Sequence, residues 1–488
     1  MYIGIDLGTS GLKLVLMAAD GQIVDTHTEK LTCSRPQPLH SEQNPEDWAN
    51  ALTQGFLCLS SRHDLEKVTA IGLSGQMHGA VLLDKTGKVL RPAILWNDGR
   101  SHQECEILEA QVPNSREITG NIMMPGFTAP KLLWVKHNEP EVFAQINKVL
   151  LPKDYIRYLL SGDYASDMSD SAGTMWMDVG KRTWNEEILE ACGLTEAHMP
   201  SLYEGSEITG YLSETLANNW SLKPVPIIAG GGDNACGAIG VGLTRPGQAM
   251  LSLGTSGVYF VVSDQFTSNP DSAVHSFCHA IPNTWHLMSV VLSAASCVSW
   301  FAEGIAKQDL DSLLSEVGLD LDIQPDSPYF LPYLTGERTP HNNPHARGVF
   351  FGMDQDTDKT KMFYAVIEGV TFALAQGVEA LHASGTQATE IMLIGGGANH
   401  VAWRQLIADT LNLPIIFCEG GEVGPGLGAA KLAQVAIEKQ TSIGSICHTP
   451  DVIATYQPNH ERHVMLAKRQ QRFANIYQQL SPLFIQED

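Results

Sequence analysis

Short apolar runs separated by turn residues recur along the chain and predict β-strands. Near the N-terminus two such runs flank a glycine-rich turn, which predicts a hairpin, and Asp20-Gly21 turns the chain into a third strand. A second pattern, with apolar residues three and four positions apart, predicts helices. The expected strands cover residues 2–6, 12–17, 23–28, 68–73, 225–229, 249–252, 258–262 and 390–394. The expected helices cover residues 45–60, 129–137, 235–241, 361–382 and 401–411.

The pentapeptide Leu-Gly-Thr-Ser-Gly occurs twice, at Leu7–Gly11 and at Leu253–Gly257, 246 residues apart in a chain of 488. Each copy lies between two apolar runs, so each is expected at a hairpin tip that presents backbone N–H groups and hydroxyls. Such a tip suits an anion such as a phosphate. The repeat therefore predicts two similar domains, over residues 1–245 and 246–488, that close on one phosphorylated ligand. Only the first copy is directly preceded by an acidic residue, Asp6, which indicates a metal ion beside the first hairpin only.

Both halves then continue in the same order, from a strand to a glycine tract and a helix of small residues. The tract is Gly230–Asn234 in the first half and Gly395–Asn399 in the second, and Gly424–Ala430 opens a last helix. Helices of small residues allow close backbone approach, as a hinge between two lobes requires. Pro246-Gly247 is the expected junction between the halves.

The composition is typical of a soluble globular protein, with 43% hydrophobic residues and a mean hydropathy of −0.07. The net charge of −23 argues against nucleic acid as a partner, since that needs a basic footprint. No apolar run is long enough to span a membrane, and no secretory signal precedes the first strand. Nine scattered cysteines without a Cys-x-x-Cys pair indicate reduced thiols, so we expect a cytoplasmic protein.

Two common nucleotide-binding motifs are absent or poorly matched. The chain has no Gly-x-x-x-x-Gly-Lys-Ser/Thr, which excludes a P-loop. The glycine tracts fit a dinucleotide fingerprint poorly and lack the acid expected after the next strand, which disfavours a Rossmann oxidoreductase.

Two carboxylates are the main candidates for chemistry. Asp6 ends an apolar strand two residues before the turn and is either a turn former or a ligand for Mg²⁺. Asp233 follows three glycines at the end of a buried strand, where it either caps the next helix or projects into a cleft. In phosphoryl transfer one carboxylate accepts the proton of the acceptor hydroxyl, and Asp233 is the best single candidate for that base.

Polar and aromatic residues after the strand at 68–73 suit a polyol. Met77-His78 could contact a sugar, although a histidine beside glycine is by itself more often structural. Trp96-Asn97-Asp98-Gly99-Arg100 combines an aromatic ring with hydrogen-bonding groups, and its alternative is a plain loop with a core tryptophan. Glu337-Arg338-Thr339-Pro340 begins either a surface loop or part of the rim around a nucleotide.

At these residues the chain resembles the FGGY carbohydrate kinases, a branch of the superfamily that includes actin, hexokinase and heat-shock ATPases. The resemblance covers nearly the whole chain, and the order and spacing of the motifs make it specific. The motifs are Gly4-Ile5-Asp6-Leu7-Gly8-Thr9-Ser10, Lys131-x-x-Trp134, Gly230-Gly231-Gly232-Asp233-Asn234, Leu253-Gly254-Thr255-Ser256, Gly336-Glu337-Arg338-Thr339-Pro340, Gly395-Gly396-Gly397-Ala398 and Gly428-Ala429-Ala430.

The resemblance implies an α/β fold of two ribonuclease-H-like (actin-like ATPase) domains, each a mixed sheet flanked by helices, around a central cleft. It implies ATP mainly on the C-terminal side, sugar mainly on the N-terminal side, Asp233 and Asp6 as catalytic residues, and both carboxylates near Mg²⁺. The implied substrate-binding residues are Met77, His78, Trp96, Asn97, Asp233 and Asn234. The implied ATP-binding residues are Gly8, Thr9, Ser10, Lys13, Gly254, Thr255, Ser256, Gly395, Gly396, Gly397 and Asn399.

Within the family, Gly75-Gln76-Met77-His78-Gly79 is similar to the pattern of members that phosphorylate D-xylulose. The Arg-Glu pair that glycerol kinases carry at this place is missing. The resemblance therefore implies ATP-dependent phosphorylation of D-xylulose to D-xylulose 5-phosphate, in xylose catabolism. The alternatives are a kinase for another ketose or polyol, such as L-ribulose, L-fuculose or gluconate, and an ATPase switch of the actin type. A homodimer is one expected assembly, since dimers are common among such enzymes.

Overall fold

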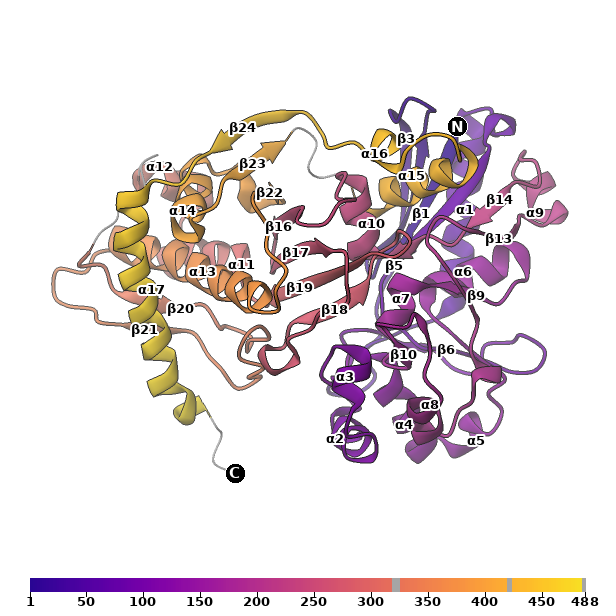
Figure 1. Ribbon diagram of the computed structural model, residues 1–488, viewed down its shortest axis with the longest axis horizontal. Coiled ribbons are helices and arrows are strands. Elements are labelled where there is room, and N and C mark those ends of the chain that lie inside the picture. The colour runs from indigo at the N-terminus through magenta and orange to yellow at the C-terminus, as the bar shows by residue number, and fades with distance from the viewer. Residues whose placement is uncertain (318–324, 419–423, 485–488) are drawn as a thin grey trace.

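Two seven-stranded mixed sheets, one in each half of the chain, organise the fold (Figure 1). The computed structural model describes residues 1–317, 325–418 and 424–484. The first sheet has the order β13-β14-β5-β1-β2-β3, with β15 beside β5, and the second has the order β18-β19-β17-β16-β22-β23-β24. The first sheet contains β1 (Tyr2–Leu7), β2 (Gly11–Met17), β3 (Ile23–Lys30), β5 (Ala70–Gly75), β13 (Ile208–Tyr211), β14 (Pro226–Ile228) and β15 (Gly231–Gly232). The second contains β16 (Ala249–Leu253), β17 (Gly257–Ser263), β18 (His275–Cys278), β19 (Trp285–Val291), β22 (Ile391–Ile394), β23 (Ile415–Cys418) and β24 (Val452–Tyr456).

The two repeats occupy equivalent places in these sheets. β1 pairs antiparallel with β2 and parallel with β5, and β16 pairs antiparallel with β17 and parallel with β22. Parallel strands end at the same edge of a sheet, so each hairpin tip lies beside the segment that follows the neighbouring strand. Both predicted hairpins and the two-sheet α/β architecture are confirmed.

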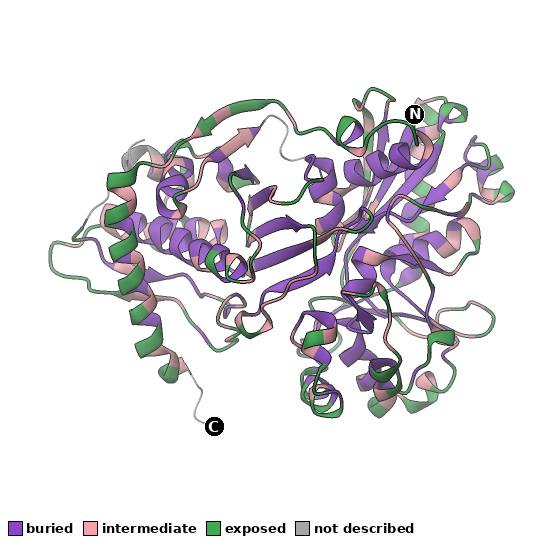
Figure 2. Cartoon of the chain, in the orientation of Figure 1, coloured by how far each residue is buried: buried purple, intermediate pink, exposed green. Residues whose placement is uncertain are grey.

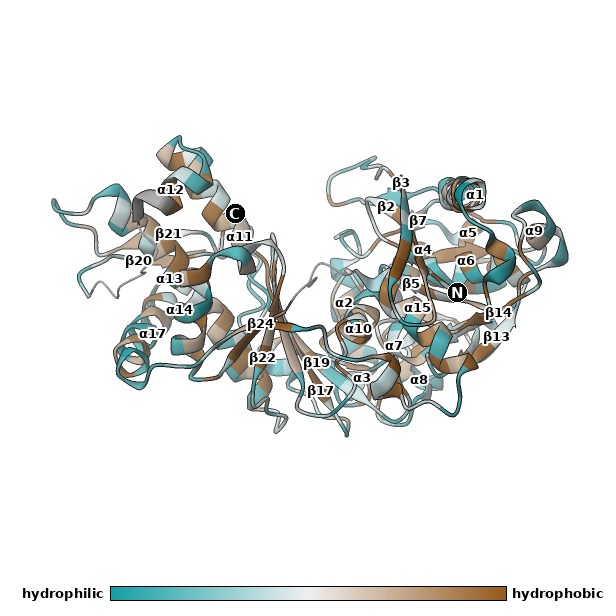
Figure 3. Cartoon of the chain, turned by 90° about the horizontal axis from the view of Figure 1, so that it is seen from above, coloured by the Kyte–Doolittle hydropathy of each residue, from teal (hydrophilic) through white to brown (hydrophobic). Residues whose placement is uncertain are grey.

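Helices cover the sheets where the apolar spacing predicts them. In the first half, α1 (Pro45–Arg62) packs on β2 and β3, and its N-cap Asn44 accepts a hydrogen bond from Glu46 N. In the second, α13 (Lys359–His382) is buried along most of its length beside α14 (Val401–Leu411). The outer helix α17 (His460–Leu480) leaves much of its surface exposed (Figure 2). Seen from above, the two lobes lie side by side with hydrophobic strands inside each (Figure 3).

Shorter elements complete the lobes. The further strands are β4 (Glu42–Gln43), β6 (Val81–Leu83), β7 (Ala93–Ile94), β8 (Lys148–Leu150), β9 (Ala165–Asp167), β10 (Met177–Asp178), β11 (Thr183–Trp184), β12 (Ser201–Tyr203), β20 (Tyr329–Leu331) and β21 (Val349–Phe351). The further helices are α2 (His102–Gln111), α3 (Ser115–Thr119), α4 (Thr128–Asn138), α5 (Pro140–Phe143), α6 (Pro152–Ser161), α7 (Met168–Ala172), α8 (Glu186–Cys192), α9 (Glu214–Asn219), α10 (Asp233–Gly240), α11 (Ala295–Ser299), α12 (Leu310–Val317), α15 (Pro425–Ile437) and α16 (Ile443–Ile446). Among the described residues, no helix is both long enough and apolar enough to cross a membrane.

Helix α15 belongs to the second half in sequence but packs on β1 and β5 of the first sheet (Figure 1). The contact is between backbones, because a Cβ atom added to Gly4 would lie 1.8 Å from Gly426 O. A Cβ atom added to Gly428 would lie 1.8 Å from Cys236 O, so α10 and α15 are equally close to each other. The close approach expected of small-residue helices is therefore confirmed, and it joins the two lobes.

The first glycine tract folds differently from the sequence expectation. Gly231 and Gly232 form β15, which pairs with Ser74 and Gly75 of β5, and α10 begins at Asp233 rather than at residue 235. Gly230 has a φ of +76°, and a Cβ atom there would lie 1.7 Å from Leu73 O. Only glycine fits this combination of backbone angle and close contact. The tract therefore lies against β5 and aims Asp233 at the cleft.

Candidate active site

A cavity of about 270 Å³ opens between the two lobes. Both halves of the chain line it, whereas the sugar side was expected mainly on the N-terminal half. The lining residues are Met77, His78, Trp96, Met124, Gly126, Phe127, Asp233, Asn234, Ser256, Val258, His275, Met288, Val290 and Arg338. Five of the six substrate residues expected from the sequence are among them, and Asn97 is not: it lines a surface hollow with residues 35–41.

Asp233 is the first residue of α10, and the N-cap of that helix is Gly232. One carboxylate oxygen of Asp233 accepts hydrogen bonds from Asn234 N at 2.8 Å and from Asn234 Nδ2 at 3.0 Å. Asn234 N belongs to the first turn of α10, so Asp233 both binds a backbone donor at the start of the helix and lines the cavity. Burial raises the pKa of Asp233 to about 6, which suits a group that takes up a proton near neutral pH.

Asp6 lies on β1, in register with Lys13 of β2 and with Ser74 of β5. Its Oδ1 atom is buried and has no hydrogen-bond partner among the described residues. Burial, and then the charge of Asp233, raise the pKa of Asp6 to about 7. An orphaned carboxylate oxygen next to a second carboxylate fits a divalent cation, which prefers oxygen ligands. In the second repeat Ser252 stands at the equivalent strand position, which leaves that side without the acid.

The turn after β5 presents His78 to the cavity. His78 has a φ of +68°, and its Nδ1–H donates to Gly173 O at 2.8 Å, which leaves Nε2 as an acceptor. Burial lowers the pKa of His78 to about 3, so the ring is neutral and acts as a hydrogen-bonding group. The ammonium group of Lys131 donates to His78 O and to Gly126 O, each at 2.7 Å. This explains the Lys131 motif: the side chain ties two lining segments together.

Thr9 joins the first hairpin to the cavity wall. Its hydroxyl donates to Gln76 Oε1 at 2.9 Å and accepts from Trp96 Nε1 at 2.9 Å, while Gln43 Nε2 donates to Thr9 O at 2.7 Å. The side chain of Thr9, expected at the nucleotide, is therefore hydrogen-bonded towards the sugar side. Trp96 keeps 43% of its surface exposed and lines the cavity, in agreement with an aromatic platform.

The rest of the Trp96 loop is structural. Asp98 and Arg100 are buried and form a two-point ion pair, with Arg100 Nε and Nη2 at 2.9 and 2.7 Å from the carboxylate oxygens. Arg100 also contacts Glu42 at 2.7 Å. These bonds hold the loop to the neighbouring segment at 41–43.

The second hairpin and the second glycine tract meet at one edge of the second sheet. Gly395 has a φ of +92°, and a Cβ atom there would lie 2.8 Å from Leu253 O. Gly396 has open space around it, and Asn399 at the end of the same turn is exposed. The backbone carbonyls of Gly254 and Thr255 accept hydrogen bonds from the segment at 294–296, whereas Ser256 lines the cavity between the lobes.

Lys13 of β2 lies beside the start of α15. A Cβ atom placed on Gly424, the N-cap of α15, would lie 3.9 Å from Lys13 Nζ. A helix N-terminus beside an ammonium group favours a phosphate. Ser10, at the tip of the first hairpin, is exposed, and Gly8 N donates to Gly11 O at 3.0 Å to close the turn.

Arg338 and His275 line the cavity from the second half and were not expected there. Arg338 Nη1 lies 3.4 Å from His275 Nε2. The neighbouring Glu337 is buried, accepts from Leu292 N and Arg338 N, and has its pKa raised by burial to about 8. From the sequence this segment was either a surface loop or part of the rim around a nucleotide. The sequence could not decide between the two, because the partners of the segment lie far away in the chain.

The comparisons with known proteins agree with this geometry. The model of the FGGY family of carbohydrate kinases, N-terminal domain, matches residues 1–240, and that of the C-terminal domain matches residues 249–437. The chain is 54% identical over 483 residues to a xylulose kinase of Escherichia coli (strain K12), covering 99% of this chain and 100% of that protein. It is 51% identical over 483 residues to a xylulose kinase of Klebsiella pneumoniae, with the same coverage.

A solved structure from Brucella ovis, described as a "xyloylose kinase", superimposes with a TM-score of 0.95 at 46% identity, over 99% of both chains. The two family models together span most of the chain, and the relatives are similar to it from end to end. Both observations indicate the same family. The chain belongs to the FGGY family of carbohydrate kinases.

Proposed function

We propose that this protein transfers the γ-phosphoryl group of ATP to D-xylulose and yields D-xylulose 5-phosphate and ADP. The observation that carries the proposal is the cavity in which Asp233, His78 and Trp96 meet, in a chain 54% identical to a xylulose kinase over its whole length. A cavity of about 270 Å³ suits a molecule of the size of a pentulose.

In this mechanism Asp233 is the base. Its carboxylate takes the proton of the C5 hydroxyl as that oxygen bonds to the γ-phosphorus, and the bond from phosphorus to the bridging oxygen of ADP breaks. A pKa of about 6 lets Asp233 be ionised at neutral pH and still accept the proton. His78 Nε2 and the Trp96 ring hold the sugar in place, which supplies the orientation that phosphoryl transfer mainly requires.

The triphosphate is assigned to the two hairpins and the second glycine tract. Backbone N–H groups at 9–10, 255–256 and 395–397, with Lys13 and the N-terminus of α15, would neutralise charge on the phosphoryl oxygens. Gly8 N and Gly254 N donate within their own turns, so these two glycines would contribute the shape of the turn. Asp6 and Asp233 would hold Mg²⁺, and the orphaned Oδ1 of Asp6 is the observation that supports this. When bound, the ion would screen the phosphate charges.

The division into domains at 245/246, the homodimer and the cytoplasmic location stay predictions. For the domains, we propose that each sheet forms one unit and that α15 is the element shared between them. Light scattering of the purified protein would test the dimer.

ADP release measured with a panel of acceptors tests the function. We expect turnover with D-xylulose to exceed that with L-ribulose, D-gluconate, glycerol or water. A higher rate with another sugar would assign the enzyme to that substrate. ADP release that no sugar stimulates would instead support an ATPase switch of the actin type.

A further inference from the structure

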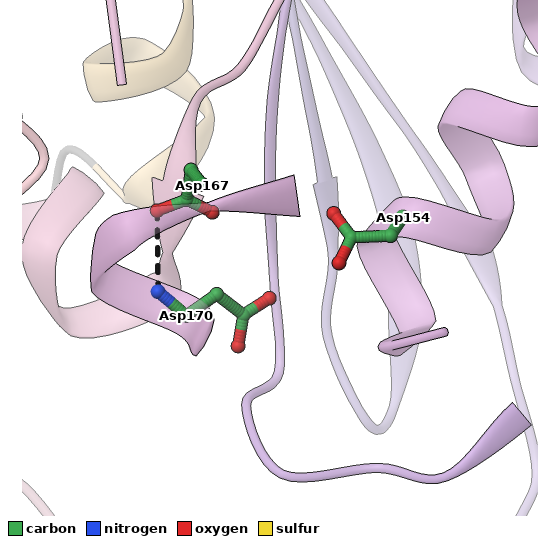
Figure 4. Close-up of side chains that lie close together, drawn as sticks. All are labelled: Asp154, Asp167 and Asp170. Carbon is green, nitrogen blue, oxygen red and sulfur yellow. Dashed lines mark hydrogen bonds between the residues drawn. The ribbon is translucent and has the colours of Figure 1, made fainter. Parts of the chain in front are cut away.

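Three buried aspartates of the first half lie together (Figure 4). Asp154 comes from α6, Asp167 ends β9, and Asp170 belongs to α7. All three side chains have no exposed surface. Their spacing resembles that of a metal site, so the charges around them decide what the cluster is.

A lysine already supplies the cation. Lys153 Nζ lies 2.5 Å from Asp154 Oδ1, 2.7 Å from Asp167 Oδ2 and 3.3 Å from Asp170 Oδ2. Arg157, also buried, lies 3.8 Å from Asp154. Burial raises the pKa of Asp170 well above its ordinary value. The ammonium group of Lys153 lies among the three carboxyl groups, in the place that a metal ion would take.

The network is connected to the first glycine tract at two places. Before the tract, Arg157 donates to Ile228 O at 3.1 Å and to Ala229 O at 2.6 Å. Within the tract, Gly232 N donates to Ser169 Oγ at 3.0 Å, and Gly232 is the residue that precedes Asp233. A glycine has no side chain to fix its own position, so these polar contacts hold the tract in place.

Ser169 is itself held firmly. Its hydroxyl donates to Asp167 Oδ1 at 2.5 Å, and the same oxygen accepts from Ser169 N at 2.8 Å and from Asp170 N at 3.1 Å. Asp167 is the N-cap of α7, and Lys153 binds its other oxygen. A Cβ atom on Gly231 would lie 2.9 Å from Ser169 Oγ, so the hydroxyl packs directly under the tract.

We propose that Ser169 is a positioning residue for phosphoryl transfer: fixed by Asp167 and Lys153, it holds the Gly232 amide and thereby aims the carboxylate of Asp233 at the acceptor hydroxyl. This inference rests on the proposed role of Asp233 as the base. Ser169 does not line the cavity, so it acts on the reaction through Gly232 and leaves sugar contacts unchanged. A displacement of the base by about 1 Å is enough to lower turnover strongly.

The chain offers a matched control in the same helix. Ser171 is as buried as Ser169, but its hydroxyl donates to Ser166 Oγ at 2.8 Å and not to the glycine tract. Ser169→Ala and Ser171→Ala therefore remove the same atom from similar surroundings, and only the first removes a contact with Gly232.

Steady-state kinetics of the full-length enzyme test the proposal. We expect Ser169→Ala to lower kcat about 10-fold to 100-fold, while KM for D-xylulose and its Kd by calorimetry change less than about 2-fold, because the cavity is intact. Ser171→Ala should keep nearly wild-type kcat, while its Tm falls by about as much as that of Ser169→Ala. Ser169→Thr, which retains a hydroxyl, should recover most of the turnover.

Four results would overturn the proposal or separate it from the assignment of the base. Equal kcat in Ser169→Ala and Ser171→Ala makes Ser169 merely structural. If Ser169→Ala does not fold, Ser169→Cys keeps the volume with a weak acceptor, and wild-type kcat there rejects the positioning role. Asp233→Asn is assayed beside these variants. If Asp233→Asn is inactive while Ser169→Ala has normal kcat, only the positioning role of Ser169 is rejected. If Asp233→Asn is active, the assignment of Asp233 as the base is rejected.

Discussion

The indole N–H of Trp96 donates a 2.9 Å hydrogen bond to the hydroxyl of Thr9, 87 residues away in the chain. Trp96 lines the cavity between the lobes, and Thr9 lies at the tip of the first hairpin. In the proposed mechanism this bond connects the wall of the sugar site with a loop assigned to ATP. The position of one substrate would then depend on the loop that holds the other.

Trp96→Phe keeps an aromatic ring and removes this bond. We expect kcat/KM for D-xylulose to fall roughly 2-fold to 10-fold, the worth of one hydrogen bond. Trp184→Phe is the control, since Trp184 Nε1 donates to Pro200 O at 3.0 Å outside the cavity. Similar effects of the two substitutions on kcat/KM would contradict a specific role for the bond to Thr9.

Asp233→Ala should lower turnover by more than about 10²-fold, because it removes the base. Binding of D-xylulose should largely survive, since His78 and Trp96 remain in place. Turnover follows from the ADP-release assay and binding from calorimetry. Near-wild-type turnover would exclude Asp233 from this role.

Activity should depend on pH through the same carboxylate. The base must be ionised to accept a proton, and burial raises the pKa of Asp233 to about 6. We therefore expect kcat/KM to decline as the pH is lowered through about 6 and to be flat above it on the acidic side of the profile. A profile that stays flat down to pH 5, roughly one unit below the raised pKa of Asp233, would show that another group is the base.

Asp6→Asn should raise stability at neutral pH while it abolishes activity. The folded-state pKa of Asp6 is raised to about 7, so the carboxyl favours folding when protonated and loses that contribution as the pH rises through about 7. Without Mg²⁺, the variant should melt a few degrees above the wild type at pH 8, and at about pH 4 the two should melt together. Asp20→Asn, at an exposed turn, is the control and should not shift Tm. A lower Tm for Asp6→Asn at pH 8 would contradict the prediction.

Arg338→Met tests the contribution of the second half to the sugar cavity. Removal of a cavity-lining guanidinium should raise KM for D-xylulose about 10-fold, as for a lost hydrogen bond to a charged group. The matched control is Arg347→Met, since Arg347 is exposed in the same segment and donates to the backbone carbonyls of Pro344 and Ala346. An unchanged KM would place Arg338 outside the substrate contacts.

Several site residues could be predicted because the signal is local. Asp6 and Asp233 each follow an apolar strand and adjoin a glycine turn, which is visible in a few consecutive residues. Trp96 and Asn97 were expected together, yet only Trp96 lines the cavity. Which neighbour faces inward depends on the path of the loop, and Asp98 and Arg100 set that path through contacts with residues 41 and 42.

The sequence by itself determined the two hairpins, the amphipathic helices and the duplicated order of elements, since apolar periodicity and turn residues act over short stretches. The tertiary structure alone decided which segments meet. Helix α15 packs on β1 more than four hundred residues earlier in the chain, Arg338 lies beside His275, and Ser169 bonds Gly232. These contacts arise because the side chains of two sheets and their helices must pack together densely. Packing between segments far apart in the chain produces no periodic pattern in the sequence.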